Sequence, residues 1–166
     1  MALYQDKKAA KPKIEDVAGD FISGDKLKNL MDFVGFLRDN KLTPRWQSSN
    51  SWKLSFKGKG VCFIKIIGGS WFVMHSALTR ERWLVGYDGY FPDELREFIW
   101  ENIRGGWCPN NCKGRSRTYF GKEFHDFCTC WAIRTENPEG VALENSKRLV
   151  LAVRNFIADL PSASKA

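Results

Sequence analysis

The pattern that most restricts the fold lies in the middle of the chain, where short apolar stretches are separated by glycine-bearing turns. Apolar and polar residues alternate over residues 51–57, which is the period of a strand with one face in water. Glycine-bearing turns then separate two further apolar runs, at residues 61–67 and 71–76. This succession predicts an antiparallel meander. Further strand-like stretches, which bring the expected sheet to about five or six strands, lie at residues 82–87, 117–120 and 127–135.

Helical patterns stand before, within and after this block of strands. We expect a short helix over residues 14–21 and a longer one with Asp25 as its N-cap and Pro44 as its stop. Pro92 suits the first position of a third helix, which two consecutive glycines end. Asn137, followed by proline, opens a last helix with apolar residues at helical spacing. The sequence thus predicts an α+β fold, with helices packed on one face of an antiparallel sheet.

Length and composition indicate one domain. With 166 residues and an apolar fraction of 43%, the chain can bury a substantial core. We expect a disordered basic tail over residues 1–13, a domain over residues 14–160 and a short tail over residues 161–166. The longest nearly uncharged apolar run, residues 61–77, is broken by Lys65, Gly68 and Gly69 and falls short of the roughly 20 residues that span a bilayer. The first residues lack the apolar core of a secretory signal. These features predict a cytoplasmic protein without a membrane partner.

Four of the five cysteines form the best candidate for a metal site. An odd number of cysteines in a chain of this length favours reduced thiols or a metal over a disulfide framework. Cys108 and Cys112 form a C-x3-C pair, and Cys128 and Cys130 form a C-x-C pair. Four thiolates could close a tetrahedral zinc site, although neither pair has the usual C-x2-C spacing. The alternatives are buried small hydrophobic residues, or redox-active thiols activated by the basic loop beside them.

Positive charge gathers in one internal segment. The net charge is +7, and residues 104–118 contribute to it without a single acid. Four cations with Trp107 and Tyr119 nearby resemble the mixture of cations and stacking rings that nucleic-acid binders use. The candidate nucleic-acid residues are Arg104, Lys113, Arg115 and Arg117. A solvated loop that aids solubility would explain the same charge.

The tryptophan-rich sheet offers a second kind of candidate site. If its aromatic residues line a concave face, they form an apolar pocket for a small ligand, with charge at the edge from Lys53 or Lys65. The pocket candidates are Trp52, Lys53, Trp71, Trp83 and Tyr87. Such aromatic residues also form ordinary cores, so the two readings depend on whether a helix covers this face.

Catalysis has little support in the sequence. His125 is flanked by Asp126 and lies three residues before Cys128, so a Cys-His-acid nucleophilic set can be drawn there. No motif of a known hydrolase or metalloprotease accompanies it. We expect Cys62 to be a packing residue of a strand, and His75, at the end of a strand, to be a sheet residue whose ring is satisfied by hydrogen bonds. The sequence therefore assigns no catalytic residue and favours a protein that is not an enzyme.

Several segments resemble a family of short, uncharacterised bacterial proteins, mostly from clostridia. The resemblance covers roughly residues 24–160. More loosely, the strand with Trp52 and Lys53 and the meander after it are similar to the YdhG-like domains of unknown function, which have an α+β fold and include a frataxin-like iron chaperone. Acids in this chain are dispersed, so the resemblance implies fold and compartment and carries over no site residue. The stretches that carry it are Asn50-Ser51-Trp52-Lys53, Gly58-Lys59-Gly60-Val61-Cys62, the cysteine loop, Tyr119-Phe120-Gly121-Lys122-Glu123-Phe124 with Cys128, and Asn137-Pro138.

Taken together, the sequence leads to a non-enzymatic cytoplasmic domain that binds a small ligand or zinc. Two alternatives stay open. One is a nucleic-acid-associated protein that uses the basic 104–117 loop, and the other is a cysteine-dependent redox or nucleophilic enzyme.

Overall fold

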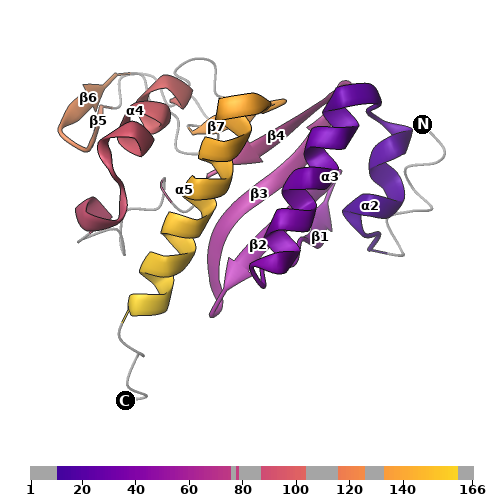
Figure 1. Ribbon diagram of the computed structural model, residues 1–166, viewed down its shortest axis with the longest axis horizontal. Coiled ribbons are helices and arrows are strands. Elements are labelled where there is room, and N and C mark those ends of the chain that lie inside the picture. The colour runs from indigo at the N-terminus through magenta and orange to yellow at the C-terminus, as the bar shows by residue number, and fades with distance from the viewer. Residues whose placement is uncertain (1–10, 76–77, 79–86, 104–115, 126–132, 161–166) are drawn as a thin grey trace.

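A computed structural model describes residues 11–75, 78, 87–103, 116–125 and 133–160 (Figure 1). Within these residues, a five-stranded antiparallel sheet with the strand order β1-β2-β3-β4-β7 carries helices on one face (Figure 1), which confirms the predicted α+β fold. Its strands are β1 (Arg45–Ser48), β2 (Ser51–Phe56), β3 (Lys59–Ile67), β4 (Ser70–Met74) and β7 (Arg134–Glu136).

The predicted meander is present, with one strand more at its start than the sequence indicated. The turn between β2 and β3 and the turn between β3 and β4 both use glycines with positive φ, at Gly58, Gly68 and Gly69. β1 was not predicted, because its four residues include a single large apolar side chain, Trp46, and no glycine follows. The β1–β2 connection instead places Ser49 and Asn50 at positive φ, as a tight hairpin turn requires.

The later strands differ from expectation in where they pair. β7 is the described end of the strand expected over residues 127–135, and it pairs with β4 through Val73 and Thr135. β5 (Arg117–Tyr119) forms a separate two-stranded sheet with β6 (Lys122–Phe124), which the sequence did not predict. The strand expected over residues 82–87 lies almost wholly outside the described residues, and its last residue begins the 3-10 turn η4 (Tyr87–Tyr90).

The helices occupy the expected stretches, with corrected ends. They are α2 (Ile14–Val17), continued by the 3-10 turn η1 (Ala18–Asp20), then α3 (Gly24–Asp39), α4 (Asp93–Asn102) and α5 (Gly140–Asp159). Ser23, not Asp25, is the N-cap of α3, and Asp25 lies in the first turn, where a carboxylate interacts favourably with the helix dipole. Pro92 is the N-cap of α4 rather than its first residue.

Asn137 does not open α5, since that helix begins at Gly140. Instead, Asn137 links the end of β7 to β4. Its backbone N–H donates to the Trp71 carbonyl at 2.8 Å, and its side-chain Oδ1 accepts from the Trp71 backbone N–H at 2.9 Å. Its Nδ2 also donates to Ser70 Oγ at 3.0 Å. The residue has φ 41°, a conformation that asparagine adopts more readily than most residues.

We expect Asn137→Ala to lower the free energy of unfolding by about 1–3 kcal/mol, because it leaves a partly buried amide of β4 without its acceptor. Chemical denaturation measures the change. Asn155→Ala, at an exposed position of α5, is the control and should change stability by less than about 0.5 kcal/mol. Equal effects of the two substitutions would contradict the role assigned to Asn137.

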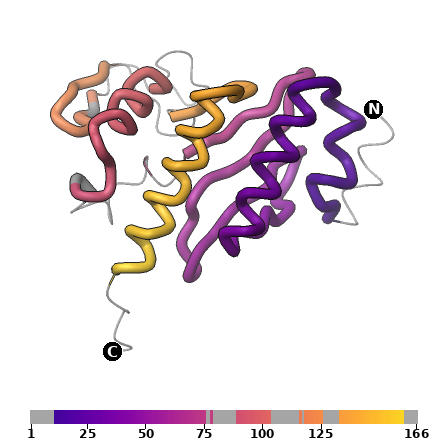
Figure 2. The backbone as a smooth tube through the Cα atoms, in the orientation of Figure 1, coloured from indigo at the N-terminus to yellow at the C-terminus, as the bar shows by residue number. Residues whose placement is uncertain are grey.

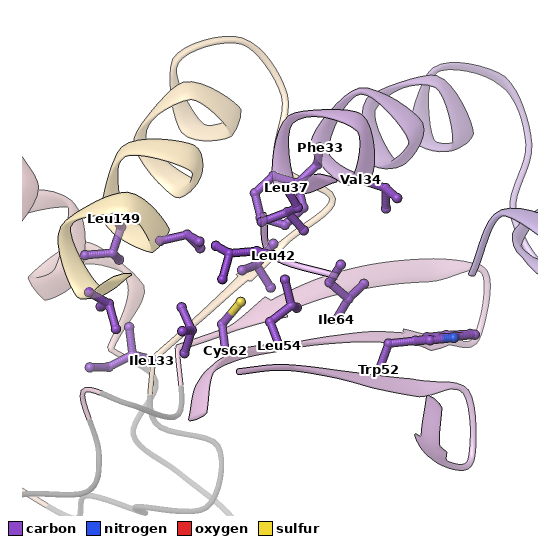
Figure 3. Close-up of a cluster of buried hydrophobic side chains, with 14 of the residues drawn as sticks. Phe33, Val34, Leu37, Leu42, Trp52, Leu54, Cys62, Ile64, Ile133 and Leu149 are labelled. Atoms are coloured by element: carbon purple, nitrogen blue, oxygen red, sulfur yellow. The ribbon is translucent and has the colours of Figure 1, made fainter. Parts of the chain in front are cut away.

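α3 and α5 cover the same face of the sheet, and the core lies between these layers. Figure 3 shows Phe33, Leu37 and Leu149 from the two helices above Leu54, Cys62 and Ile64 of the sheet. A register shift after Leu54 forms a bulge, and both Val61 and Cys62 are buried there. Between the helices, Lys147 Nζ of α5 donates to Asp32 Oδ2 of α3 at 2.8 Å. These contacts fix the helical layer on one side of the sheet.

The ends of the helical layer carry the smaller elements. α2 lies beyond α3, while α4 and the β5–β6 hairpin lie beyond α5 (Figure 2). Trp100 of α4 donates its indole N–H to the Tyr119 carbonyl of β5 at 2.8 Å, which ties the hairpin to the helix. At the other end, the Trp52 indole N–H donates to the Pro12 carbonyl at 3.0 Å. Pro12 thus belongs to the folded part, although the sequence placed it in the tail.

Candidate functional site

The proposed tryptophan pocket is a core in the part of the chain that the structure describes. Trp52 and Trp71 are both 0% exposed, and they share the core face of the sheet with the buried Ile64 and Ile66, with which they pair. Phe33 of α3 packs against Trp71 with ring centroids 5.8 Å apart. Lys53 follows Trp52 in β2 and therefore lies on the opposite face of the sheet. Of the remaining pocket candidates, Trp83 lies outside the described residues, and Tyr87 is described by its backbone alone.

The four metal candidates, Cys108, Cys112, Cys128 and Cys130, all lie outside the described residues. Within the described ranges, no cluster of three or more histidine, cysteine, aspartate or glutamate side chains could hold a metal ion. A zinc site at the four cysteines stays a prediction from the sequence.

The basic-loop candidates fall largely outside the described ranges as well. Arg104, Lys113 and Arg115 are not described, and Arg117 is described only as backbone in β5. His125 is exposed, and its Nδ1 lies 2.9 Å from Ser116 Oγ. Cys128, its partner in the nucleophilic set drawn from the sequence, is not among the described residues.

Cys62 is a packing residue, as expected, whereas His75 is buried directly after β4 without the hydrogen-bond partner that was expected for its ring, among the described residues. Both are buried, at 0% and 1% exposure. Burial raises the pKa of the Cys62 thiol, because a thiolate would be costly to enclose in apolar surroundings. Burial lowers the pKa of His75 to about 3, and neither ring nitrogen has a hydrogen-bond partner among the described residues. Both groups are therefore neutral at pH 7 and closed off from any substrate.

The opposite face of the sheet has a different composition, which the strand register defines. Arg45 of β1 pairs with Lys53 of β2, Lys53 pairs with Phe63 of β3, Phe63 with Met74 of β4, and Met74 with Arg134 of β7. Directly paired residues in a sheet share a face. One row of side chains thus crosses all five strands, with cations at its ends and apolar residues at its centre. We call the face that carries this row the outer face.

A second row of the outer face runs beside the first. Ser51 pairs with Lys65, Lys65 with Phe72, and Phe72 with Glu136. The two rows together hold four cations, Arg45, Lys53, Lys65 and Arg134, against one carboxylate, Glu136. Most of these side chains are partly exposed, and Arg45 and Glu136 are exposed. The guanidinium carbon of Arg134 lies 5.7 Å from the centroid of the Phe72 ring.

Sequence reasoning missed the outer face, although a signal for it exists. The apolar run over residues 61–67 reads as a strand buried on both faces, except that it contains Lys65. Because side chains alternate along a strand, Phe63 must share the face of this lysine. Lys65 therefore could have marked Phe63 as an outward ring. Arg134 and Phe72 become neighbours only through the β4–β7 pairing, which no local pattern reveals.

The chemistry that this face can supply is attraction of anions and stacking of planar groups. The cations attract phosphate or carboxylate groups, and the two phenylalanines offer flat apolar rings between them.

None of the described helices is long and apolar enough to cross a bilayer. The resemblance to the clostridial family and to YdhG-like domains stays a prediction. Comparisons with protein-family models, with curated proteins and with solved structures found no match to this chain.

Proposed function

We propose that this domain is a nucleic-acid-binding module and that the outer face of the sheet is its binding surface. The observation that carries the proposal is the row Arg45–Lys53–Phe63–Met74–Arg134, which places cations on both sides of an apolar centre. The binding function itself is the alternative that the sequence raised for the basic loop, moved here to a surface whose residues are described.

Charge favours a polyanion over a single small anion. With neighbouring strands about 4.8 Å apart, a row across five strands is about 19 Å long. The cations lie at both ends of this row and also at Lys65, beside its centre. A single carboxylate or phosphate could reach one end of it. A chain of phosphates could contact both ends at once, and each contact releases a counterion, which favours binding.

The apolar centre favours a polyanion that also carries flat rings. Phe63, Phe72 and Met74 are partly exposed on the face opposite the core. Aromatic side chains among cations are the combination on which nucleic-acid-binding sheets stack their bases. The helices lie on the other side, so the outer face presents these side chains without a described helix over it (Figure 1).

Salt-dependent binding of labelled 20-nucleotide oligonucleotides, followed by fluorescence anisotropy, tests this function. The double variant R45Q/K53Q removes two cations of the row, and we expect it to weaken binding about tenfold at 0.1 M salt. It should also lower the slope of log K against log salt by about 0.7–0.9 for each lost phosphate contact.

The matched control is K28Q/R148Q, which removes one lysine and one arginine from exposed positions of α3 and α5. It makes the same change in net charge on the other side of the sheet and should bind as the wild type does. Equal loss in both double variants would reduce the effect to net charge. Loss only in R115A/R117A would return the function to the basic loop.

A further inference from the structure

We infer that the outer face selects single-stranded nucleic acid, with two successive bases stacked on Phe63 and Phe72 and with the Arg134 guanidinium closing over the base on Phe72. This inference rests on the proposed function and names the class of nucleic acid that the same surface takes.

The register places the two rings as neighbours. Phe63 pairs with Met74, and Phe72 pairs with Lys65, so the phenylalanines stand diagonally across β3 and β4. Diagonal neighbours on one face of an antiparallel pair are about 7–8 Å apart. Two bases of one extended strand can therefore each meet a ring. The side chain that faces Phe63 directly is Met74, whose flexible thioether adapts to irregular apolar contacts.

Stacking on these rings excludes a duplex. In a base-paired helix the faces of the bases are buried against one another, so only phosphates and groove edges are offered to a protein. A single strand can splay its bases onto aromatic side chains, as sheet-based binders use them. The cations of the outer face would attract either form, whereas the two rings reward only the form whose bases are free to stack.

Arg134 supplies a second planar group for the base that stacks on Phe72, so that this base lies between the ring and the guanidinium. In the unbound protein its guanidinium lies over the Phe72 ring, at 5.7 Å from the centroid. A planar guanidinium stacks on aromatic and base faces, which a lysine ammonium cannot do. A base that binds Phe72 takes the place of this guanidinium, and Arg134 then lies on the opposite side of the base. The residue thereby acts in positioning the base and adds a charge near the adjoining phosphate.

The test compares a fluorescein-labelled 20-nucleotide single strand with the corresponding duplex, for wild type, F63L, F72L and R134K. We expect the wild type to prefer the single strand, and each leucine variant to lose about 5- to 150-fold in single-strand affinity. Duplex affinity should change less than about twofold. R134K, which keeps the charge, should weaken the single strand more than the duplex. F21L, at a ring that is 38% exposed beyond η1, is the control and should bind as the wild type does.

A further variant keeps the test informative if a leucine variant fails to fold. F72W retains a stacking ring, so it should keep single-strand affinity within about threefold, and its added emission should be quenched when a base stacks on it. Equal wild-type affinity for the two forms, with unchanged binding in F63L and F72L, overturns the inference and leaves the charge-based function standing. Salt-insensitive or absent binding of both forms overturns the proposed function itself.

Discussion

Replacing Trp52 with alanine should lower the free energy of unfolding by about 3–5 kcal/mol, which is the cost of truncating a large, fully buried aromatic residue. The indole is enclosed on the helical side of the sheet, and its ring meets that of Trp46 edge to face at a centroid distance of 5.2 Å. Its N–H also donates to the Pro12 carbonyl, so the substitution frees the segment that precedes α2. Urea denaturation followed by circular dichroism measures the loss.

Trp46→Ala is the comparison, because this ring lies on the edge strand β1 and is only partly buried. It gives up the edge-to-face contact, worth about 0.5–1.5 kcal/mol, together with part of its apolar area, so its cost should be clearly smaller. If Trp52 instead lined an open pocket, its replacement by alanine would lower ligand affinity and leave the free energy of unfolding nearly unchanged. That outcome would refute a closed core at Trp52.

The second large effect concerns pH and His75. Its pKa in the folded protein is about 3, against an ordinary value of about 6.5, so the unfolded chain binds the proton more tightly. Stability contributed by the neutral imidazole is present above pH 6.5 and is lost as the pH falls towards 3. The expected loss is about 3 kcal/mol between pH 6.5 and pH 4. Denaturation curves at half-unit pH steps measure it.

His75→Leu isolates this contribution. All other titratable groups are the same in both proteins, so their contributions to the pH dependence cancel in the difference. The difference in stability between the wild type and the leucine variant should therefore shift by about 3 kcal/mol over this range, in favour of the variant at low pH. If the stability of the two proteins instead changed in parallel with pH, the pKa of His75 would be the same in the folded and unfolded chains, and the prediction would be wrong.

The fold was predictable from the sequence wherever the signal was local. Alternation over residues 51–57 and the paired glycines at 68 and 69 specify β2, β3 and β4 with their turns. β1 escaped because a turn of Ser49 and Asn50 carries no glycine signal. The helix ends were shifted because Asp25 is both a good N-cap and a good first-turn residue.

The candidate site was less predictable, because it depends on which residues share a face. Trp52 and Lys53 are neighbours in the sequence, and the sequence reading placed both at one pocket. In the sheet they lie on opposite faces, one in the core and one on the outer face. Arg134 joins that face only through a pairing with β4 that is distant along the chain. The separation of Trp52 from Lys53 follows from strand alternation and could have been read locally, whereas the β4–β7 register joins distant segments and leaves no mark in a short window of sequence.

The topology of the sheet also gives its assembly an order in time. β1 to β4 are joined by tight turns, so little loop-closure entropy opposes their pairing. β7 must close a long loop before it pairs with β4, since Trp71 and Asn137 are 66 residues apart. From loop-closure entropy we expect β7, which carries Arg134, to pair later than the strands of the meander. A brief detachment of this three-residue edge strand would remove one end of the cationic row while the hairpins stay folded. Under the proposed function, the affinity of the outer face would therefore depend on the β4–β7 pairing, which joins the strands farthest apart in the chain.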